Sequence, residues 1–213
     1  SAASFILGLI FTIKLPNPKQ KKEIKPGTTK QVILKNKFLF LSLLLRHIGA
    51  AAVWTILPIM IIEKWGGDLY HISIVYVANT MTAFILMNIM ASKIKLSNVT
   101  KFKIGIGFTT FVFVGLSFVT EWWMAMPFMS LVGATWAFLF IGGNFHLMEN
   151  NPRSTSTGIF SSTLSIATVI GPIVAGSIAY VFDYISVMYF AIVIIVCAFI
   201  VSLKIKNEVK IER

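Results

Sequence analysis

Six long apolar segments, separated by short polar turns, dominate the pattern of hydrophobic and polar positions. A helix rises 1.5 Å per residue, so segments of this length cross a hydrocarbon core of roughly 30 Å. The pattern therefore predicts six complete transmembrane helices. Their expected ranges are 38–62, 71–92, 104–120, 123–148, 158–181 and 185–203.

The segments that flank these six spans are of three kinds. Residues 1–13 are apolar and indicate the end of a preceding transmembrane helix. Residues 14–37 contain eight lysines and four prolines or glycines, which is typical of a basic cytoplasmic loop. Residues 204–213 form a charged cytoplasmic tail, which leaves 38–203 as the six-helix bundle. Because the chain begins with Ser1 and its first residues lack a basic n-region or cleavage site, we expect it to be part of a longer protein.

Lysine and arginine are distributed unevenly between the two sides that alternate turns define. Of the 19 cations, 17 fall on one side, Lys64 falls on the other, and Arg46 lies inside the first span. Cytoplasmic loops carry an excess of cations, so the side with 17 is predicted to be cytoplasmic. Both ends of the segment are then cytoplasmic, and we expect a multi-pass protein of the plasma membrane.

Composition agrees with this interpretation. With 56% hydrophobic and 13% charged residues, the chain is too apolar for a soluble domain. A net charge of +11 would suit nucleic acid only if cations lay on one face beside stacking aromatics, whereas here they separate apolar segments. The expected partner is therefore the lipid bilayer and not nucleic acid. Cys197 is the only cysteine, so no internal disulfide is possible.

The fifth span contains a stripe of small residues at helical spacing. Such a stripe lets a neighbouring backbone approach closely in lipid, where helices associate through packing and hydrogen bonds. Pro172 cannot donate to the carbonyl of Thr168, so a kink is expected. The stripe consists of Gly158, Ser161, Ser162, Ser165, Thr168, Pro172, Ala175, Gly176 and Ala179. Of the residues in this span, we expect helix packing and gating from Gly158, Gly171, Pro172 and Gly176.

A family resemblance begins in the same stretch. Pro152, Arg153 and Gly158, then Gly171-Pro172 and Gly176 before Asp183, resemble the turn and eleventh helix of the major facilitator superfamily, whose members are secondary transporters with twelve helices in two similar halves. The resemblance implies that this chain is the C-terminal half, from the end of helix six through helix twelve. The turn after the second span departs from the family pattern, since it has no acid.

Six spans divide into two groups of three. Because three is odd, the second group must run opposite to the first, as in the inverted repeats of such transporters. We therefore expect an all-α membrane protein with six complete transmembrane helices in two inverted three-helix repeats, preceded by the end of one further helix. The resemblance also implies that the first and fourth spans line a central cavity, that the second and fifth flank it, and that the third and sixth face lipid.

Several polar and aromatic residues within the spans are candidates for the substrate path. Arg46 lies about 12 Å along the first span from Phe38, where a cation costs perhaps 2.5 to 3.5 kcal/mol. It either faces a cavity, or extends its stem so that its charge reaches the cytoplasmic surface, or pairs with a carbonyl. The full set is Arg46, Trp54, Asn79, Trp136, Phe140, Asn144 and His146.

Each of these candidates also has a purely structural alternative. Pockets combine apolar walls with a few polar anchors, which favours Trp136, Phe140 and Asn144 as contacts to a substrate. The aromatics equally well pack against neighbouring helices, and Asn144 equally well links two helices by hydrogen bonds. For Asn79, a link between helices is favoured over contact with a ligand. His146 lies three residues before Glu149, a spacing at which the two side chains can share a proton.

Patterns typical of enzymes are missing. His47, His71 and His146 belong to separate spans, and neither an HExxH motif nor a phosphate-binding glycine motif occurs. We expect no enzyme activity, no metal and no cofactor. The predicted function is that of the C-terminal half of a secondary active transporter, which moves a small solute by alternating access together with the N-terminal six-helix half of the same protein. The alternative is a non-transporting helical membrane scaffold or assembly protein.

Overall fold

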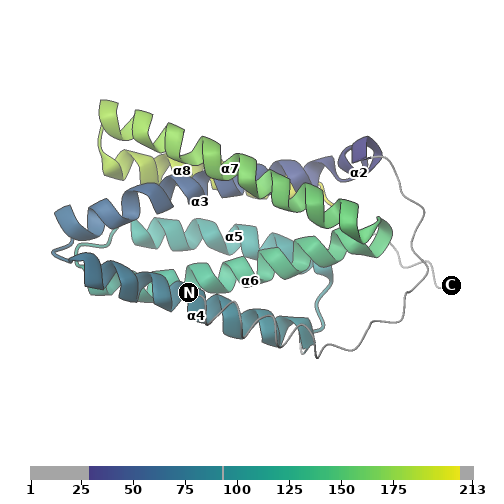
Figure 1. Cartoon of the computed structure of the whole chain (residues 1–213), viewed down its shortest axis with the longest axis horizontal. Helices are drawn as coiled ribbons and strands as arrows, with labels where there is room; N and C mark the ends of the chain where they lie inside the picture. The colour runs from purple at the N-terminus through teal and green to yellow at the C-terminus, as the bar shows by residue number, and fades with distance from the viewer. Residues whose placement is uncertain (1–28, 93, 207–213) are drawn as a thin grey trace, which may run out of the picture.

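The computed structural model describes residues 29–92 and 94–206, and this part of the chain is helical with no strand (Figure 1). Six of its helices are long and apolar enough to cross a membrane. They are α3 (Lys37–Glu63), α4 (Leu69–Ser92), α5 (Asn98–Leu116), α6 (Ala125–Asn150), α7 (Arg153–Val181) and α8 (Tyr184–Leu203). A short helix α2 (Thr29–Lys35) precedes them, and a single 3-10 turn η1 (Trp122–Met124) leads into α6. The expected end of a further helix at 1–13 lies outside the described residues.

The six long helices form two groups of three, α3–α5 and α6–α8, which pack mainly against each other. Helix α3 packs extensively against α7 and α8, α6 packs against α4 and α5, and α5 packs against α8. Within each group, successive helices touch little. If α3, α4 and α5 are exchanged with α6, α7 and α8 in that order, the same pairs of helices are in contact. Inverted repeats require this correspondence. The predicted fold class, an all-α membrane protein with six spanning helices, is confirmed for the described residues.

Glycines allow the closest approaches between the two groups. A Cβ atom added at Gly105 of α5 would lie 2.5 Å from the backbone nitrogen of Leu139, and one added at Gly142 of α6 would lie 2.5 Å from the nitrogen of Phe102. Neither distance leaves room for a side chain. Small residues at helix contacts are typical of membrane proteins, because close backbone packing replaces the hydrophobic driving force between helices.

Several boundaries differ from the sequence prediction, and α7, for example, begins at Arg153 instead of residue 158. Helix α5 begins at Asn98 instead of residue 104, since the Ser97 side chain accepts a hydrogen bond of 3.1 Å from the Thr100 amide and caps the helix. Lys103 lies inside this helix and donates to the carbonyl of Ile205 at 2.9 Å. The predicted loop 14–37 also differs, because residues 29–35 form α2 and residue 37 begins α3. Residues 14–28 of that loop lie outside the described part.

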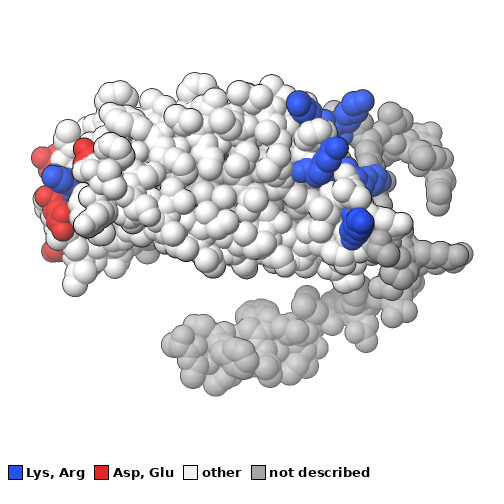
Figure 2. All heavy atoms as spheres, turned by 90° about the horizontal axis from the view of Figure 1, so that it is seen from above, with Lys and Arg blue, Asp and Glu red and all other residues white. Residues whose placement is uncertain are grey.

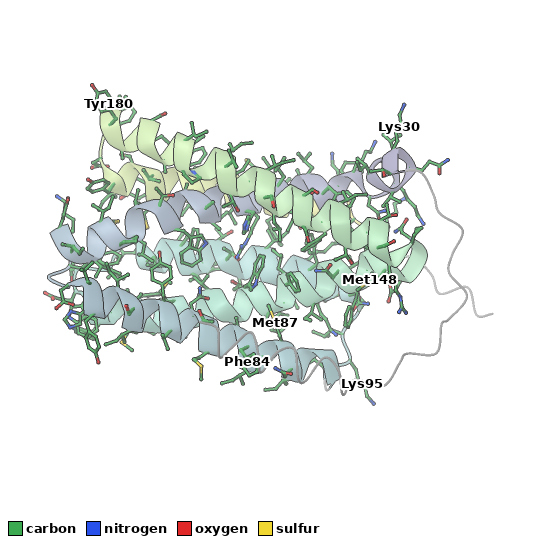
Figure 3. All side chains as sticks on the ribbon, viewed as in Figure 1. Lys30, Phe84, Met87, Lys95, Met148 and Tyr180 are labelled. Atoms are coloured by element: carbon green, nitrogen blue, oxygen red, sulfur yellow. The ribbon has the colours of Figure 1, made fainter. Side chains whose placement is uncertain are left out.

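Charged side chains lie at the two ends of the bundle. On the face seen in Figure 2, lysine and arginine gather at one end, aspartate and glutamate lie at the other with a single cation among them, and the band between is uncharged. Lys30 and Lys95 mark the basic end in Figure 3, and Tyr180 marks the opposite end. The uncharged band is the part that a hydrocarbon core would surround. Which end is cytoplasmic stays a prediction from the cation count.

Candidate functional site

A cavity of about 250 Å³ lies between α3, α4 and α6, so residues of both three-helix groups enclose it. It combines one cation, three aromatic rings, two small polar side chains and two apolar ones. Its lining is Arg46, His47, Trp54, Asn79, Thr80, Ala83, Val132 and Trp136. A larger hollow of about 470 Å³ between α2 and α7 has no charged or aromatic lining, so it offers weaker anchors for a ligand.

Arg46 is the central polar residue of the smaller cavity, and only 1% of it is exposed. Its Nη2 donates to Thr109 Oγ1 on α5 at 3.3 Å, and its Cζ lies 5.5 Å from the ring centroid of Trp136. The guanidinium is thus held between a hydroxyl and an aromatic face. Its Nε is buried and has no hydrogen-bond partner among the described residues. Because the head group is buried, Arg46 does not extend to the surface at either end of the bundle.

His47 was not among the predicted site residues, yet it lies beside Arg46 in the cavity wall. Its ring centroid is 5.5 Å from that of Trp136, and its Nε2 lies 3.4 Å from Thr168 Oγ1 on α7. Its Nδ1 is buried without a hydrogen-bond partner in the described part of the chain. Successive helical residues are turned by about 100°, so neighbours on a helix usually face different surroundings. Arg46 and His47 both line the cavity because it lies between the two directions in which their side chains leave α3.

The bend-prone part of α3 contributes Trp54. Pro58 has no amide hydrogen, so the carbonyl of Trp54 loses its donor within the helix. The hydroxyl of Tyr76 on α4 donates to this carbonyl at 3.2 Å, and the two rings lie 5.8 Å apart. The proline thus creates a link between α3 and α4 beside the cavity. This link also positions α4 residues Asn79 and Thr80 in the wall.

Three predicted candidates lie outside the lining. Phe140 follows Trp136 in a row of rings, with centroids 5.5 Å apart, and meets Phe160 of α7 at 5.6 Å. Asn144 donates to the carbonyl of Phe140 at 3.1 Å, which is a bond within its own helix. His146 is buried elsewhere on α6. The structure therefore brings together Arg46, Trp54, Asn79 and Trp136, and it does not bring Phe140, Asn144 or His146 to the same cavity.

Proton sharing between His146 and Glu149 stays a prediction, and Glu149 also has a structural contact with another helix. Its Oε1 accepts a hydrogen bond of 2.7 Å from Asn98 Nδ2 at the start of α5. This exposed contact joins the ends of α5 and α6. It gives Glu149 a structural partner at the end of the bundle.

The small residues of α7 are divided between two faces. A Cβ added at Gly171 would lie 2.8 Å from the carbonyl of Ile48 on α3, so Gly171 lies at a close helix contact. At Gly158 and Gly176 an added Cβ would meet nothing within 4 Å in the described residues. Pro172 is half-buried beside Gly171. Of the expected stripe, Ser161, Ser162, Ser165 and Thr168 are also exposed.

Acidic groups are remote from the cavity. None of its lining residues is an aspartate or glutamate. Within the described ranges every acid lies at a helix end or in a turn, namely Glu63, Asp68, Glu121, Glu149 and Asp183. The charge of Arg46 consequently has no carboxylate counterpart in the part of the protein that is described. The described residues also contain no group of three His, Cys, Asp or Glu side chains with the geometry to hold a metal ion.

No protein-family model matches this sequence, and a comparison with curated proteins finds no match. The resemblance to facilitator transporters therefore rests on the residues quoted for it.

Proposed function

We propose that this chain forms one half of a secondary transporter of the facilitator type, which moves a small solute across the membrane by alternating access. The remaining partner is the N-terminal six-helix half of the same protein. The proposal also includes the orientation predicted from the cations, with the basic end of the bundle at the cytoplasmic face of the plasma membrane. No enzymatic step is included.

The observation that carries this proposal is the place of the cavity. Substrate sites of such transporters lie deep in the membrane, where the inverted repeats meet. The cavity here is enclosed by α3 and α4 from one group and by α6 from the other. It also holds the buried cation Arg46 and the amide of Asn79. Polar groups at this depth are costly, and in membrane proteins they mark substrate or ion pathways.

A second observation supports the partner. Helix α7 has a row of hydroxyl and small residues that no other described segment covers, including Ser161, Ser162 and Ser165. Small residues with hydroxyl groups suit a contact with another helix or a water-filled path better than a contact with lipid. A second helical bundle placed against α7 and α4 would cover this row and close the open side of the cavity.

The proposal is testable without knowing the substrate. Thr80 is exposed on α4 and lines the cavity, so Thr80→Cys in a Cys197→Ala background reports water access. We expect impermeant thiol reagents to label this cysteine in the complete protein from outside in right-side-out vesicles and from inside in inverted vesicles. Val193→Cys is the matched control, since Val193 is 63% exposed on the strongly apolar α8 and should resist both reagents.

The outcome separates transporter from scaffold. A transporter that alternates between an outward-open and an inward-open state exposes the cysteine of Thr80→Cys to each side of the membrane in turn. Labelling from both sides therefore supports transport. Labelling from one side only, or from neither, would contradict alternating access and favour the non-transporting scaffold, in which the polar residues only join helices.

A further inference from the structure

We propose that the cavity around Arg46 is an anion site, and that it binds the carboxylate of a small organic acid whose apolar part lies against Trp54 and Trp136. The proposal rests on the proposed transport function, because it names the class of solute that such a transporter would carry. It begins from one fact that packing alone does not explain, namely a fully buried arginine that has no acidic partner among the described residues.

Arg46 lacks the compensation that buried cations require. A buried charge is tolerated when a counter-charge or several hydrogen bonds replace water. Here the guanidinium has a single hydroxyl, that of Thr109, as its hydrogen-bond acceptor within the described residues. That hydroxyl itself donates to the carbonyl of Gly105 at 2.6 Å, so it is already oriented. The buried Nε of Arg46 has no acceptor within the described residues.

The orientation of the guanidinium favours a carboxylate. Contact with Trp136 on one side and Thr109 on the other restrains its position. A restrained planar fork can bind a planar carboxylate through two parallel hydrogen bonds, and less entropy is lost than with a mobile lysine. The lining has no lysine and no second arginine, which favours an anion with one charge over a phosphate dianion.

The remaining walls indicate the body of the ligand. Trp54, Trp136 and Val132 provide apolar and aromatic surface, whereas Asn79 and Thr80 offer hydrogen bonds on the α4 side. The cavity volume of about 250 Å³ is slightly below the roughly 300–1,000 Å³ of most ligand sites. These properties fit a small carboxylic acid with a compact aromatic or aliphatic group.

The test compares acids with their neutral amides in the purified complete protein. Benzoate, 3-phenylpropionate and hexanoate are titrated against benzamide, 3-phenylpropionamide and hexanamide, and the thermal unfolding temperature is measured for each. Acid and amide share shape and apolar surface and differ in charge. We expect a saturable rise with at least one acid and none with its amide. In Arg46→Gln the apparent Kd of that acid should rise at least about tenfold, which corresponds to losing one charged hydrogen-bonded contact.

Two further variants keep the result decisive. Arg46→Lys retains the charge without the planar fork, so it should bind the acid more weakly than the parent and more tightly than Arg46→Gln. Lys64→Gln removes an exposed cation outside the cavity and should leave the acid response unchanged. Equal responses to acid and amide in the parent, or no response to any acid, would overturn the anion site.

An acid supplied by the other half of the protein is the competing explanation for Arg46. In that case Arg46→Gln would strongly destabilise the protein without ligand, and the parent would show no preference for acids over amides. Failure of transport is distinguishable from failure of the anion site. Binding of the acid without access of Thr80→Cys from both sides would contradict the transporter alone, whereas two-sided access without acid binding would contradict the anion site alone.

Discussion

Helices α3 and α4 are equally hydrophobic, yet they are packed very differently. In the most apolar part of α3, 61% of the residues are buried, against 11% in α4 and 17% in α7. Helix α3 contacts α7 and α8 closely, whereas α4 presents large side chains outward, including Phe84, which is 66% exposed and labelled in Figure 3. Hydropathy thus determines which segments enter the membrane, and the placement of small residues determines which of them become the packed core.

The two outer helices also differ from each other. The outward side of α4 is mainly apolar, with Val77, Met81 and Phe84 exposed. Helix α7 has an apolar exposed side at Val169 and Ile173, and in addition a row of exposed hydroxyl residues that begins at Ser161. Protein or water suits the hydroxyl row of α7, whereas the apolar side of α4 suits either lipid or the apolar surface of a partner helix. The predictions below test this division between core and outer surfaces, from the largest expected effect to the smallest.

The first prediction concerns a core glycine. Gly105→Ala places a methyl group 2.5 Å from the backbone of α6, so the α5–α6 contact must open. Overpacking of this kind costs about 3 kcal/mol, and we expect a large drop in thermal stability in detergent. Gly158→Ala is the matched control on the outer surface, where nothing lies within 4 Å, and it should be neutral or slightly stabilising. Equal losses in both variants would contradict the assignment of core and surface.

The second prediction concerns the outer face of α7. Gly176→Leu meets open space within the described residues, so we expect the six-helix bundle to keep its stability. If the other half of the protein packs against this face, the same change should greatly reduce the labelling of Thr80→Cys from one or both sides. The control is Val193→Leu on the exposed side of α8. Gly66 is not used as a control, because it lies in a turn with a φ of +65°. Unchanged labelling in Gly176→Leu would show that this part of α7 faces lipid.

The third prediction concerns the link between the core and α4. Tyr76→Phe removes the hydroxyl that donates to the Trp54 carbonyl and should cost about 1 kcal/mol of unfolding free energy. Pro58→Ala restores an amide donor to that carbonyl within α3. In a double-mutant cycle, Tyr76→Phe should therefore cost clearly less in the Pro58→Ala background. Simple additivity of the two changes would show that the hydroxyl bond is unimportant for holding α4.

The smallest effect is expected at the turn before α8. Asp183 caps this helix by accepting from the Ser186 amide at 2.7 Å. The side chain and the amide of Ser186 both hold the pKa of Asp183 below its ordinary value. A lowered pKa means that the stabilisation is present above the ordinary pKa and is lost as pH falls through the value in the folded protein. Asp183→Ala should slightly lower thermal stability at neutral pH, and Asp183→Asn, which keeps an acceptor, should lower it less.

The spans were predicted well from the sequence because the length of an apolar run depends mainly on one requirement, namely that the helix cross the thickness of the bilayer. The start of α5 was predicted six residues late, since Lys101 and Lys103 resemble loop residues until the partner of Lys103 at Ile205 is known. That contact joins residues about one hundred positions apart. Boundaries that depend on such partners require the tertiary structure.

The candidate site was predicted in part for a similar reason. Arg46, Trp54, Asn79 and Trp136 stand out because polar or amphipathic residues deep in a span are costly. His47 was missed because the direction of the cavity relative to α3 follows from packing. On α7, large Phe160 is buried within the bundle and small Gly158 is not, so the packing role expected of Gly158 stays a prediction. Gly143 on α6 lies next to the Phe160 ring, so its missing side chain accommodates that ring.

The contacts between the two three-helix groups limit how this bundle can move. Helix α5 is locked against α6 by Gly105 and Gly142, and α3 is locked against α7 by Gly171. Separating the groups would break each of these close backbone contacts at once, and no flexible side chain is available there to adapt. If the two-sided access proposed above occurs, we expect the six helices to turn as one rigid body, so that the cavity wall formed by Arg46 and Trp136 moves with them and keeps its shape.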